Sequence, residues 1–244
     1  MANTAAMKFR RNPGTAIALL IAGHPLQATM IAVGVAVVAA LVGRPLREVA
    51  LVLATVFVGR LTAGWLNDVA DRERDIAVER GDKPIAREWL HPSTVTFTVA
   101  CATLLLVPLS LSNGYSAGIA HLLSVVAAWL YNTRLKLTWL SWLPWAVSFG
   151  LLPAVVTYGG WGGGWHGGPP TITITVLAAL LGVGVHFLDA LPDLVGDNQN
   201  GVRSAPLRVA LRLGALKLLW ISGTFTALVI AGLVVAGLSV GVAQ

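Results

Sequence analysis

The chain has 244 residues, of which 56% are hydrophobic and only 11% are charged, and its formal net charge is +6. Its mean hydropathy of +0.75 lies far from the balance of a water-soluble globular protein, so the sequence predicts an integral, multi-pass membrane protein. The single cysteine, Cys101, excludes a disulfide framework and a metal site built from thiolates.

Seven apolar runs are long enough to cross about 30 Å of hydrocarbon as helices. They cover residues 15–42, 49–67, 93–112, 115–132, 139–158, 171–189 and 213–242. We therefore expect an all-α bundle of about seven transmembrane helices, forming one domain over residues 15–244. A polar and basic cytoplasmic leader, residues 1–14, precedes it.

The basic residues are unevenly placed along this predicted bundle. With the N-terminus in the cytoplasm, fourteen of the seventeen Lys and Arg residues fall in cytoplasmic segments, while Arg44 and Arg47 lie outside and Arg60 lies within a span. This distribution follows the positive-inside rule, so the positive charge needs no nucleic-acid partner. It also predicts that the N-terminus is cytoplasmic and that the C-terminus and the segment 159–170 lie on the other side.

The first acidic cluster directly follows the second apolar run. If that helix continues at about 100° per residue, Asp68, Asp71 and Asp75 fall on one face, with Asn67 one turn before Asp71. Arg60 lies on nearly the same face, about 10 Å deeper in the membrane. Because an intramembrane Arg is costly unless it is paired, we interpret Arg60 either as a counter-charge to the aspartates or as a phosphate contact.

The second acidic cluster ends the sixth apolar run. Asp189, Asp193 and Asp197 are spaced four and four, which again predicts one helical face, also on the cytoplasmic side. Carboxylates this close repel one another unless a cation lies between them. Asp and Asn oxygens suit Mg²⁺, which takes one or two carboxylates together with phosphate oxygens of a substrate.

Cations for such a phosphate stand in two predicted cytoplasmic loops. Lys83 lies in the polar connection 71–92, and the turn after the fourth run contains Tyr131, Asn132, Arg134 and Lys136. A diphosphate that is bridged by two Mg²⁺ ions and surrounded by these cations would be a stabilised leaving group. Its lipid tail would lie between the apolar helices, so we expect substrates and products that are membrane lipids.

The acidic and basic motifs, in the order in which they occur along the chain, resemble those of the UbiA superfamily of intramembrane prenyltransferases. The run Asn67-Asp-Val-Ala-Asp71-Arg-Glu-Arg-Asp75, with Arg60 upstream, is similar to the first family signature, N-D-x-x-D-x-x-x-D. The second signature, D-x-x-x-D-x-x-x-D, is similar to residues 189–197. Further motifs of the family resemble Lys83-Pro84, Gly201-Val202-Arg203-Ser204 and Leu213-Gly214.

The resemblance implies a helical bundle around a central cavity, two Mg²⁺ ions, a polyprenyl diphosphate donor and an acceptor that is often aromatic. It implies metal ligands at Asn67, Asp68, Asp71, Asp75, Asp189, Asp193 and Asp197, of which Asp71, Asp75, Asp193 and Asp197 would be catalytic. It implies diphosphate contacts at Arg60, Lys83, Tyr131, Asn132, Arg134 and Lys136.

Two features depart from the family pattern. Tyr131 and Lys136 are five residues apart instead of four, and only seven helices can be counted before Gln244, whereas the family usually has nine. The difference in helix number would leave the bundle open to lipid, require a partner chain, or mean that the sequence is truncated.

Two histidines lie near the predicted site. His186, one turn before Asp189, is expected to point into the cavity, where it would bind the acceptor hydroxyl or take its proton; alternatively, it bonds a neighbouring helix or orients Asp189. We interpret His24, before Pro25 in the first run, as a structural group.

Two other functions compete with prenyl transfer. One is a terpene cyclase of the same fold, which would need no acceptor. The other is a non-catalytic lipid-binding protein or a transporter. Transport is disfavoured because the carboxylates lie at helix ends and not at mid-membrane.

Overall fold

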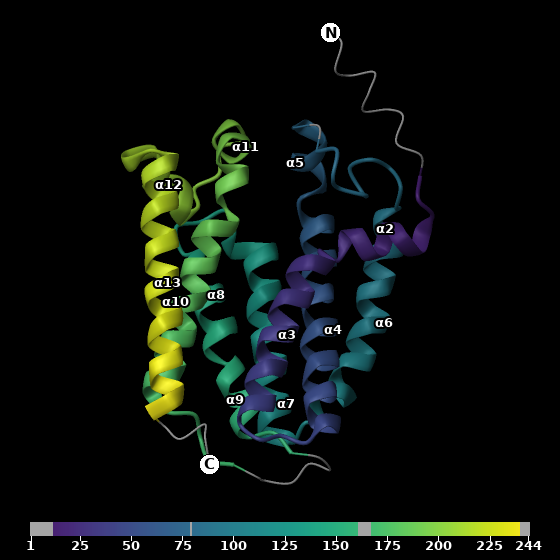
Figure 1. The fold of residues 1–244 in the computed structure, drawn as a ribbon. Coiled ribbons are helices and arrows are strands. Elements are labelled where there is room, and N and C mark those ends of the chain that lie inside the picture. Colours follow the sequence, from purple (N-terminus) through teal and green to yellow (C-terminus); the bar gives the residue numbers. More distant parts are fainter. Residues whose placement is uncertain (1–11, 79, 161–166, 240–244) are drawn as a thin grey trace.

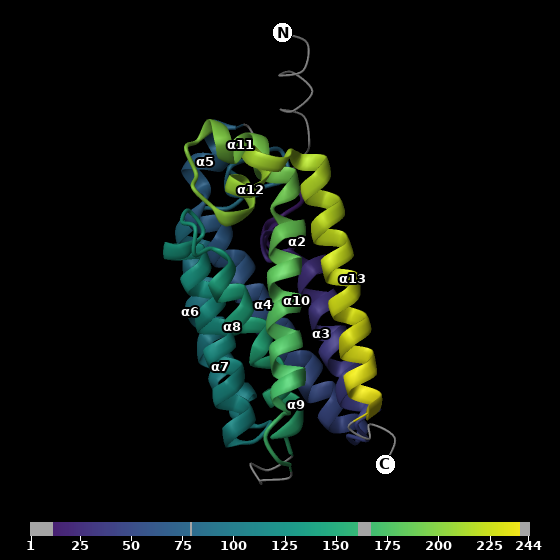
Figure 2. The same cartoon turned by 90° about the vertical axis from the view of Figure 1, so that its left-hand side faces the viewer.

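The computed structural model describes residues 12–78, 80–160 and 167–239 (Figure 1). Within these residues the secondary structure is helical, and the long helices run side by side in one bundle, as the two perpendicular views show (Figures 1 and 2). Most of the predicted leader, residues 1–11, and part of the predicted outer segment, residues 161–166, lie outside the described part of the chain.

The helices that cross the bundle are α3 (Pro25–Leu41), α4 (Leu46–Ala70), α6 (Pro92–Leu111), α7 (Tyr115–Leu130), α8 (Trp142–Gly150) followed by α9 (Leu152–Thr157), α10 (Ile172–Asp189) and α13 (Ala215–Ser239). Shorter elements are α2 (Thr15–Ala22), α5 (Arg72–Ala77), the π-helical turn η1 (Tyr131–Leu135), the 3₁₀ turn η3 (Leu191–Asp193), α11 (Leu194–Gln199) and α12 (Ala205–Leu213). Each predicted apolar run is therefore helical over most of its described length, which confirms the all-α bundle.

Several of these helices meet the length and composition expected of a membrane span. In the described residues, four stretches do so: α4, α6, Ile172–Gln199, which runs from α10 through η3 to α11, and α13; the bent pair α2 and α3 makes a fifth. The remaining two predicted spans are shorter, since α7 has 16 residues and the apolar helix Trp142–Thr157 is broken in the middle. The protein is thus a polytopic membrane protein.

Proline accounts for two departures from straight helices. α2 and α3 meet at an angle of 59°, where His24 adopts left-handed backbone angles and Pro25, lacking an N–H group, begins α3. The fifth predicted run divides into α8 and α9 at Leu151, because Pro153 cannot donate a hydrogen bond to the preceding turn.

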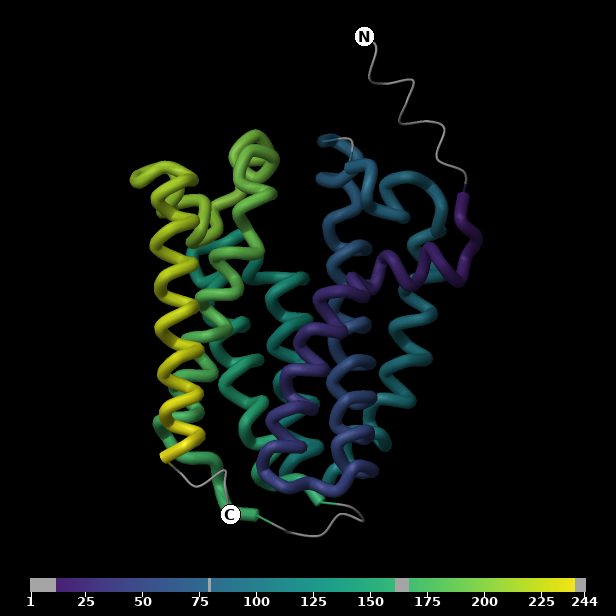
Figure 3. The backbone as a smooth tube through the Cα atoms, in the orientation of Figure 1, coloured from purple at the N-terminus to yellow at the C-terminus, as the bar shows by residue number. Residues whose placement is uncertain are grey.

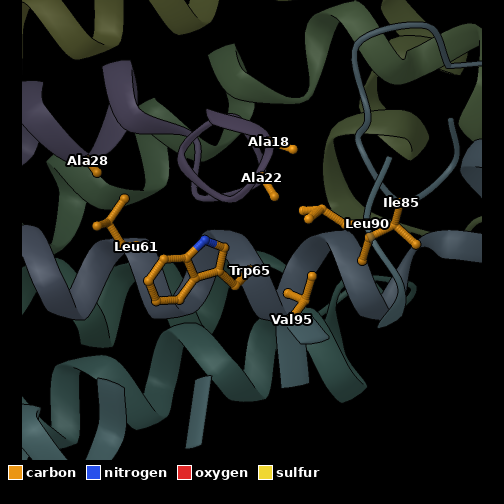
Figure 4. Packing of buried hydrophobic residues seen from close by; sticks show 8 residues of the cluster. All are labelled: Ala18, Ala22, Ala28, Leu61, Trp65, Ile85, Leu90 and Val95. Atoms are coloured by element: carbon orange, nitrogen blue, oxygen red, sulfur yellow. The ribbon is translucent and has the colours of Figure 1, made fainter. Parts of the chain in front are cut away.

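The corner between α2 and α3 is packed tightly on α4. Side chains from four helices (α2, α3, α4 and α6) and from the loop between α5 and α6 form one buried cluster (Figure 4). Its members are Ala18, Ala22, Ala28, Leu61, Trp65, Ile85, Leu90 and Val95. A Cβ atom on Gly64 would lie 2.5 Å from the backbone oxygen of Gly23. Close approach at small residues is how membrane helices gain packing energy without a hydrophobic driving force between them.

The helices form two groups with the acidic segments at the same end. α3 packs on α4, which also packs on α6, while α10 packs between α8 and α13. In the tube view, α5 lies above the first group and α11 above the second (Figure 3). The start of α2 lies at this end as well, whereas α13 ends at the opposite end (Figure 1).

Candidate active site

A cavity of about 270 Å³ opens at the end of the bundle where α4 and α10 end. All but three of the site residues predicted from the sequence line it: Arg60, Asn67, Asp71, Asp75, Lys83, Tyr131, Asn132, Lys136, Asp189, Asp193 and Asp197. The exceptions are Asp68, Arg134 and His186. The fold therefore brings two segments more than 100 residues apart in sequence to one site.

The first acidic segment is almost a continuous helix. α4 ends at Ala70, and Asp71 stands in a turn before α5, but the Asp71 N–H still donates to the Asn67 oxygen and the Asp75 N–H to the Asp71 oxygen, each at 2.9 Å. Asn67, Asp71 and Asp75 consequently share the cavity wall, as their spacing predicted. Asp68 does not line the cavity; it is 1% exposed and pairs with Lys83.

Basic side chains from three elements lie on this first segment. Lys136 and Arg74 each form an ion pair with Asp71, on different carboxylate oxygens. The Lys136 ammonium also donates to Asn67 Oδ1 at 2.9 Å. Lys83 Nζ lies 3.2 Å from Asp68 Oδ1. These ion pairs offset the cost of burying the carboxylates of Asp68 and Asp71.

The π-helical turn η1 explains how Lys136 reaches the cavity. The backbone N–H of Lys136 donates to the backbone oxygen of Tyr131, five residues earlier, at 2.8 Å. In an α-helix a residue five positions on would point about 140° away, whereas the wider turn returns Lys136 to the cavity wall with Tyr131 and Asn132. Arg134, within the turn, is exposed and lies outside the cavity lining, so its predicted diphosphate contact is not supported.

The second acidic segment is not the single continuous α-helix that its spacing predicted. α10 ends at Asp189, and Pro192 lies in the 3₁₀ turn before α11. Asp189, Asp193 and Asp197 nevertheless all line the cavity. Gln27 Nε2 donates to Asp189 Oδ1 at 3.1 Å, and Arg80 pairs with Asp193.

Two carboxyl groups outside the spans show opposite pKa shifts. Burial raises the pKa of Asp75 to about 6, and one of its oxygens is buried without a hydrogen-bond partner. The Arg80 guanidinium, which donates to both oxygens of Asp82 at 2.9 and 3.0 Å, lowers the pKa of Asp82 to about 2. The unpaired oxygen of Asp75 is a position where a cation would be favourable.

The donor set of the cavity fits Mg²⁺ in one particular way. Nowhere in the described ranges do three or more His, Cys, Asp or Glu side chains converge closely enough to hold a metal alone. Mg²⁺ does not need such a cage, because it usually binds one or two carboxylates, water and substrate phosphate oxygens. Asp and Asn oxygens on two sides of one cavity, including the unpaired oxygen of Asp75, are donors of this type.

The deep wall of the cavity is aromatic and carries one cation. The Arg60 guanidinium lies 5.7 Å from the ring centroid of Trp145 and 5.8 Å from that of Phe149. Its Nη1 is 3.5 Å from Ser148 Oγ. Among the described residues Arg60 forms no ion pair, so it does not act as a contact counter-charge to the aspartates.

His186 lies behind this wall, and the expectation that it points into the cavity was wrong. It is 1% exposed, its ring stacks on Trp145 with centroids 5.6 Å apart, and it meets Tyr131 edge-on at 5.4 Å. Its Nε2 is 3.0 Å from Ser141 Oγ, which also accepts the Ala205 N–H. His186 is thus bonded to a neighbouring segment, the structural alternative named above.

Sequence reasoning missed several residues of the cavity. Gln27, Arg80, Trp145 and Ser148 line it, and so does His24, which the sequence placed as a structural group. Arg80 stands in the acidic loop and could have been found there. No sequence signal marked Gln27 or Ser148, because they come from apolar segments whose approach to the acidic segments depends on the tertiary fold.

A helical membrane bundle with two acidic segments around one cavity is the architecture expected of an intramembrane prenyltransferase. The chain matches the model of the UbiA prenyltransferase family over residues 28–243, and it belongs to that family. Comparison with curated protein sequences gives no significant match.

Solved structures show the same fold. The chain is similar to a UbiA homolog from Archaeoglobus fulgidus bound to DMAPP and Mg²⁺, with a TM-score of 0.69 and 16% identity over 87% of this chain and 76% of that chain. A UbiA homolog from the same organism bound to GPP and Mg²⁺ matches with a TM-score of 0.69 and 16% identity, over 88% of this chain and 77% of that chain. A structure of a digeranylgeranylglyceryl phosphate synthase matches with a TM-score of 0.60 and 18% identity, over 89% of this chain and 75% of that chain. At these identities the likeness establishes the fold.

Proposed function

We propose that the protein transfers a prenyl group from a polyprenyl diphosphate to an aromatic or lipid acceptor within the membrane, in a reaction that requires Mg²⁺. One observation carries the proposal: the two acidic segments and the cations Lys83 and Lys136 line one cavity at the mouth of an apolar bundle. The Archaeoglobus fulgidus homologs bound to Mg²⁺ with DMAPP or GPP support the same donor class.

Six side chains on the cavity wall would hold two Mg²⁺ ions between them and the diphosphate: Asn67, Asp71, Asp75, Asp189, Asp193 and Asp197. We assign Asp68 a different role from the one expected, because it lies outside the wall and holds Lys83. Bound Mg²⁺ supplies positive charge to the phosphate oxygens on which negative charge develops.

The protein's own cations act beside the metal. Lys83 and Lys136 line the cavity from two different loops, so they would donate to diphosphate oxygens from two directions. Asn132 is held in place by its donation to the Ala63 oxygen at 2.8 Å. When the carbon–oxygen bond of the donor breaks, the electron pair leaves with the diphosphate, whose charge these groups stabilise.

The aromatic wall suits the other product of that step, an allylic cation. Tyr131 and Trp145 line the cavity and contact each other edge-on, with ring centroids 5.6 Å apart. Aromatic faces attract cations, most strongly where water is excluded. The acceptor carbon or oxygen then bonds to the cation, and the proton that the acceptor loses passes to a diphosphate oxygen or to water.

We further propose that the cavity opens to the cytoplasm. The supporting observation is the positive-inside bias, because Arg72, Arg74, Arg80, Arg203 and Arg208 all belong to segments at the acidic end of the bundle.

The test is an incubation of purified protein with Mg²⁺, labelled geranyl diphosphate or a longer homologue, and a panel of acceptors, followed by mass analysis of the lipid product. We expect a prenylated acceptor and free diphosphate, and neither in the presence of a chelator. Product formation from the donor alone would indicate a terpene cyclase instead. Full activity in chelator would contradict the metal-dependent reaction.

A further inference from the structure

The corner between α2 and α3 contains an unusual backbone conformation. His24 has φ 52° and ψ 59°, and with Glu88 it is one of two non-glycine residues with positive φ in the described chain. Such angles are costly for a residue with a side chain and persist only where the surroundings enforce them. Strain of this kind is a reason to ask what the side chain does.

The surroundings do enforce it. A Cβ atom on Gly23 would lie 2.7 Å from a methyl carbon of Leu61 and 3.1 Å from Trp65 Nε1. Trp65 Nε1 donates to the Leu19 oxygen at 2.8 Å, and Gly64 touches the Gly23 backbone. α4 therefore holds the turn directly before His24, and the imidazole lines the cavity.

There the imidazole meets Lys83. His24 Nε2 and Lys83 Nζ are 2.9 Å apart. Since an ammonium group can only donate, Nε2 is the acceptor, and the ring is neutral with its proton on Nδ1. Lys83 has three N–H groups, of which one is directed at His24. The ammonium also forms an ion pair with Asp68, whose Oδ1 lies 3.2 Å away outside hydrogen-bond geometry. Held between these two partners, Lys83 keeps further N–H groups for the cavity that it lines.

The same corner reaches the second acidic segment. Gln27, one helical turn after His24, donates to Asp189 Oδ1 at 3.1 Å. The corner thus contacts Lys83, beside the first acidic segment, and Asp189, in the second, and it forms a third wall of the cavity between them.

We propose that His24 is a positioning residue for the donor site: it orients Lys83 so that the free N–H of the ammonium points at the diphosphate, while Gln27 holds Asp189 opposite. This inference rests on the proposed function, because it concerns the same diphosphate. The alternative is that His24 only fills space at the corner. If His24 positions Lys83, a substitution weakens donor binding and leaves stability nearly unchanged. If His24 only fills space, a substitution lowers stability and leaves donor binding unchanged.

The experiment compares two variants of the purified full chain. His24→Gly removes the acceptor and accommodates the left-handed backbone without strain. His24→Gln keeps an acceptor at about the reach of Nε2. Leu26→Ala, at a side chain that is 75% exposed on the same corner, is the matched control. Affinity for geranyl diphosphate with Mg²⁺, the KM values of donor and acceptor, and the melting temperature are measured.

We expect His24→Gly to weaken donor binding about tenfold, the value of one charge-assisted hydrogen bond, with the acceptor KM and melting temperature nearly unchanged. His24→Gln should recover most of the affinity, and Leu26→Ala should match the unmodified protein. In a Lys83→Met background the effect of His24→Gly should vanish, because both act through one contact.

The inference is overturned if His24→Gly binds the donor normally, if His24→Gln loses as much affinity as His24→Gly, or if the effect persists in the Lys83→Met background. Should His24→Gly fail to fold, His24→Asn replaces it, since Asn tolerates left-handed angles and is too short to reach Lys83. If the unmodified protein binds no prenyl diphosphate, the proposed function itself fails, which is a different result.

Discussion

The two acidic segments have similar spacing and different surroundings. In the first, Asp71 and Asp75 are 5% and 8% exposed, and Asp71 is paired with cations on both carboxylate oxygens. In the second, the side chain of Asp193 is 38% exposed, and within the described part of the chain it pairs with Arg80 alone. The first segment is fixed by several ion pairs. The second has fewer charged contacts and is held mainly by the packing of Leu194 against Leu207 and Leu218.

This difference has an energetic consequence. Removing one member of a buried ion pair leaves the other charge uncompensated, while removing an exposed member costs little. We therefore expect the first segment to act as the rigid half of the site and the second as the half that adapts to the donor.

The largest predicted effect separates the two halves directly. Asp71→Ala should lower kcat about 10³-fold and Asp193→Ala about 10²-fold, the range found when a charge-stabilising group is removed. Single-turnover rates with a labelled prenyl diphosphate measure both. Glu73→Gln, at an exposed position on α5, is the control and should retain full activity. Equal losses at Asp71 and Asp193 would remove the distinction between the halves.

A second comparison concerns the two cations of the π-helical turn. Lys136→Gln should raise the donor KM about 10- to 100-fold, because Lys136 contacts Asn67 and Asp71. Arg134→Gln should stay within about twofold, since Arg134 is exposed. Steady-state kinetics at saturating acceptor give both values. A strong effect of Arg134→Gln would show that this side chain reaches the substrate after all.

His186 allows a smaller test of the aromatic wall. His186→Ala should destabilise the protein by about 2–4 kcal/mol, because it removes a buried ring and a hydrogen bond. Thermal unfolding in detergent measures this change. Because His186 lies behind Tyr131 and Trp145, the KM values of donor and acceptor should rise together. A rise in the acceptor KM alone, at unchanged stability, would restore the catalytic role that the sequence suggested.

The last prediction leaves activity unchanged and compares the two ends of the bundle. In a Cys101→Ala background, Glu73→Cys should react with a membrane-impermeant thiol reagent only from the cytoplasm, and Gly168→Cys only from the opposite side. Both positions are exposed. Labelling of Gly168→Cys from the cytoplasm would contradict the predicted orientation.

Much of the fold was predictable because membrane helices are long apolar runs. The first acidic segment was predictable for a similar reason: Asn67, Asp71 and Asp75 continue the helical period of α4. The second segment was predicted as one helix, yet Pro192 divides it. Proline lacks an N–H group and interrupts the hydrogen bonds of an α-helix, so the spacing of the aspartates alone does not predict this break.

The remaining residues could not be found from local patterns. His186 is only about 60° from Asp189 around the helix, and the packing of Tyr131 and Trp145 decides that it faces away from the cavity. His24 reaches Lys83 only because Gly23 and Gly64 let two helices touch. Such contacts depend on the tertiary approach of distant segments.

The π-helical turn also bears on how this chain should be aligned with its relatives. A π turn holds one residue more than an α turn, so Tyr131 and Lys136, five apart, face the same cavity that a pair spaced by four would face in an α-helix. A motif defined by a fixed spacing of four would therefore pass over Lys136, although the wider turn places it on the cavity wall with Tyr131.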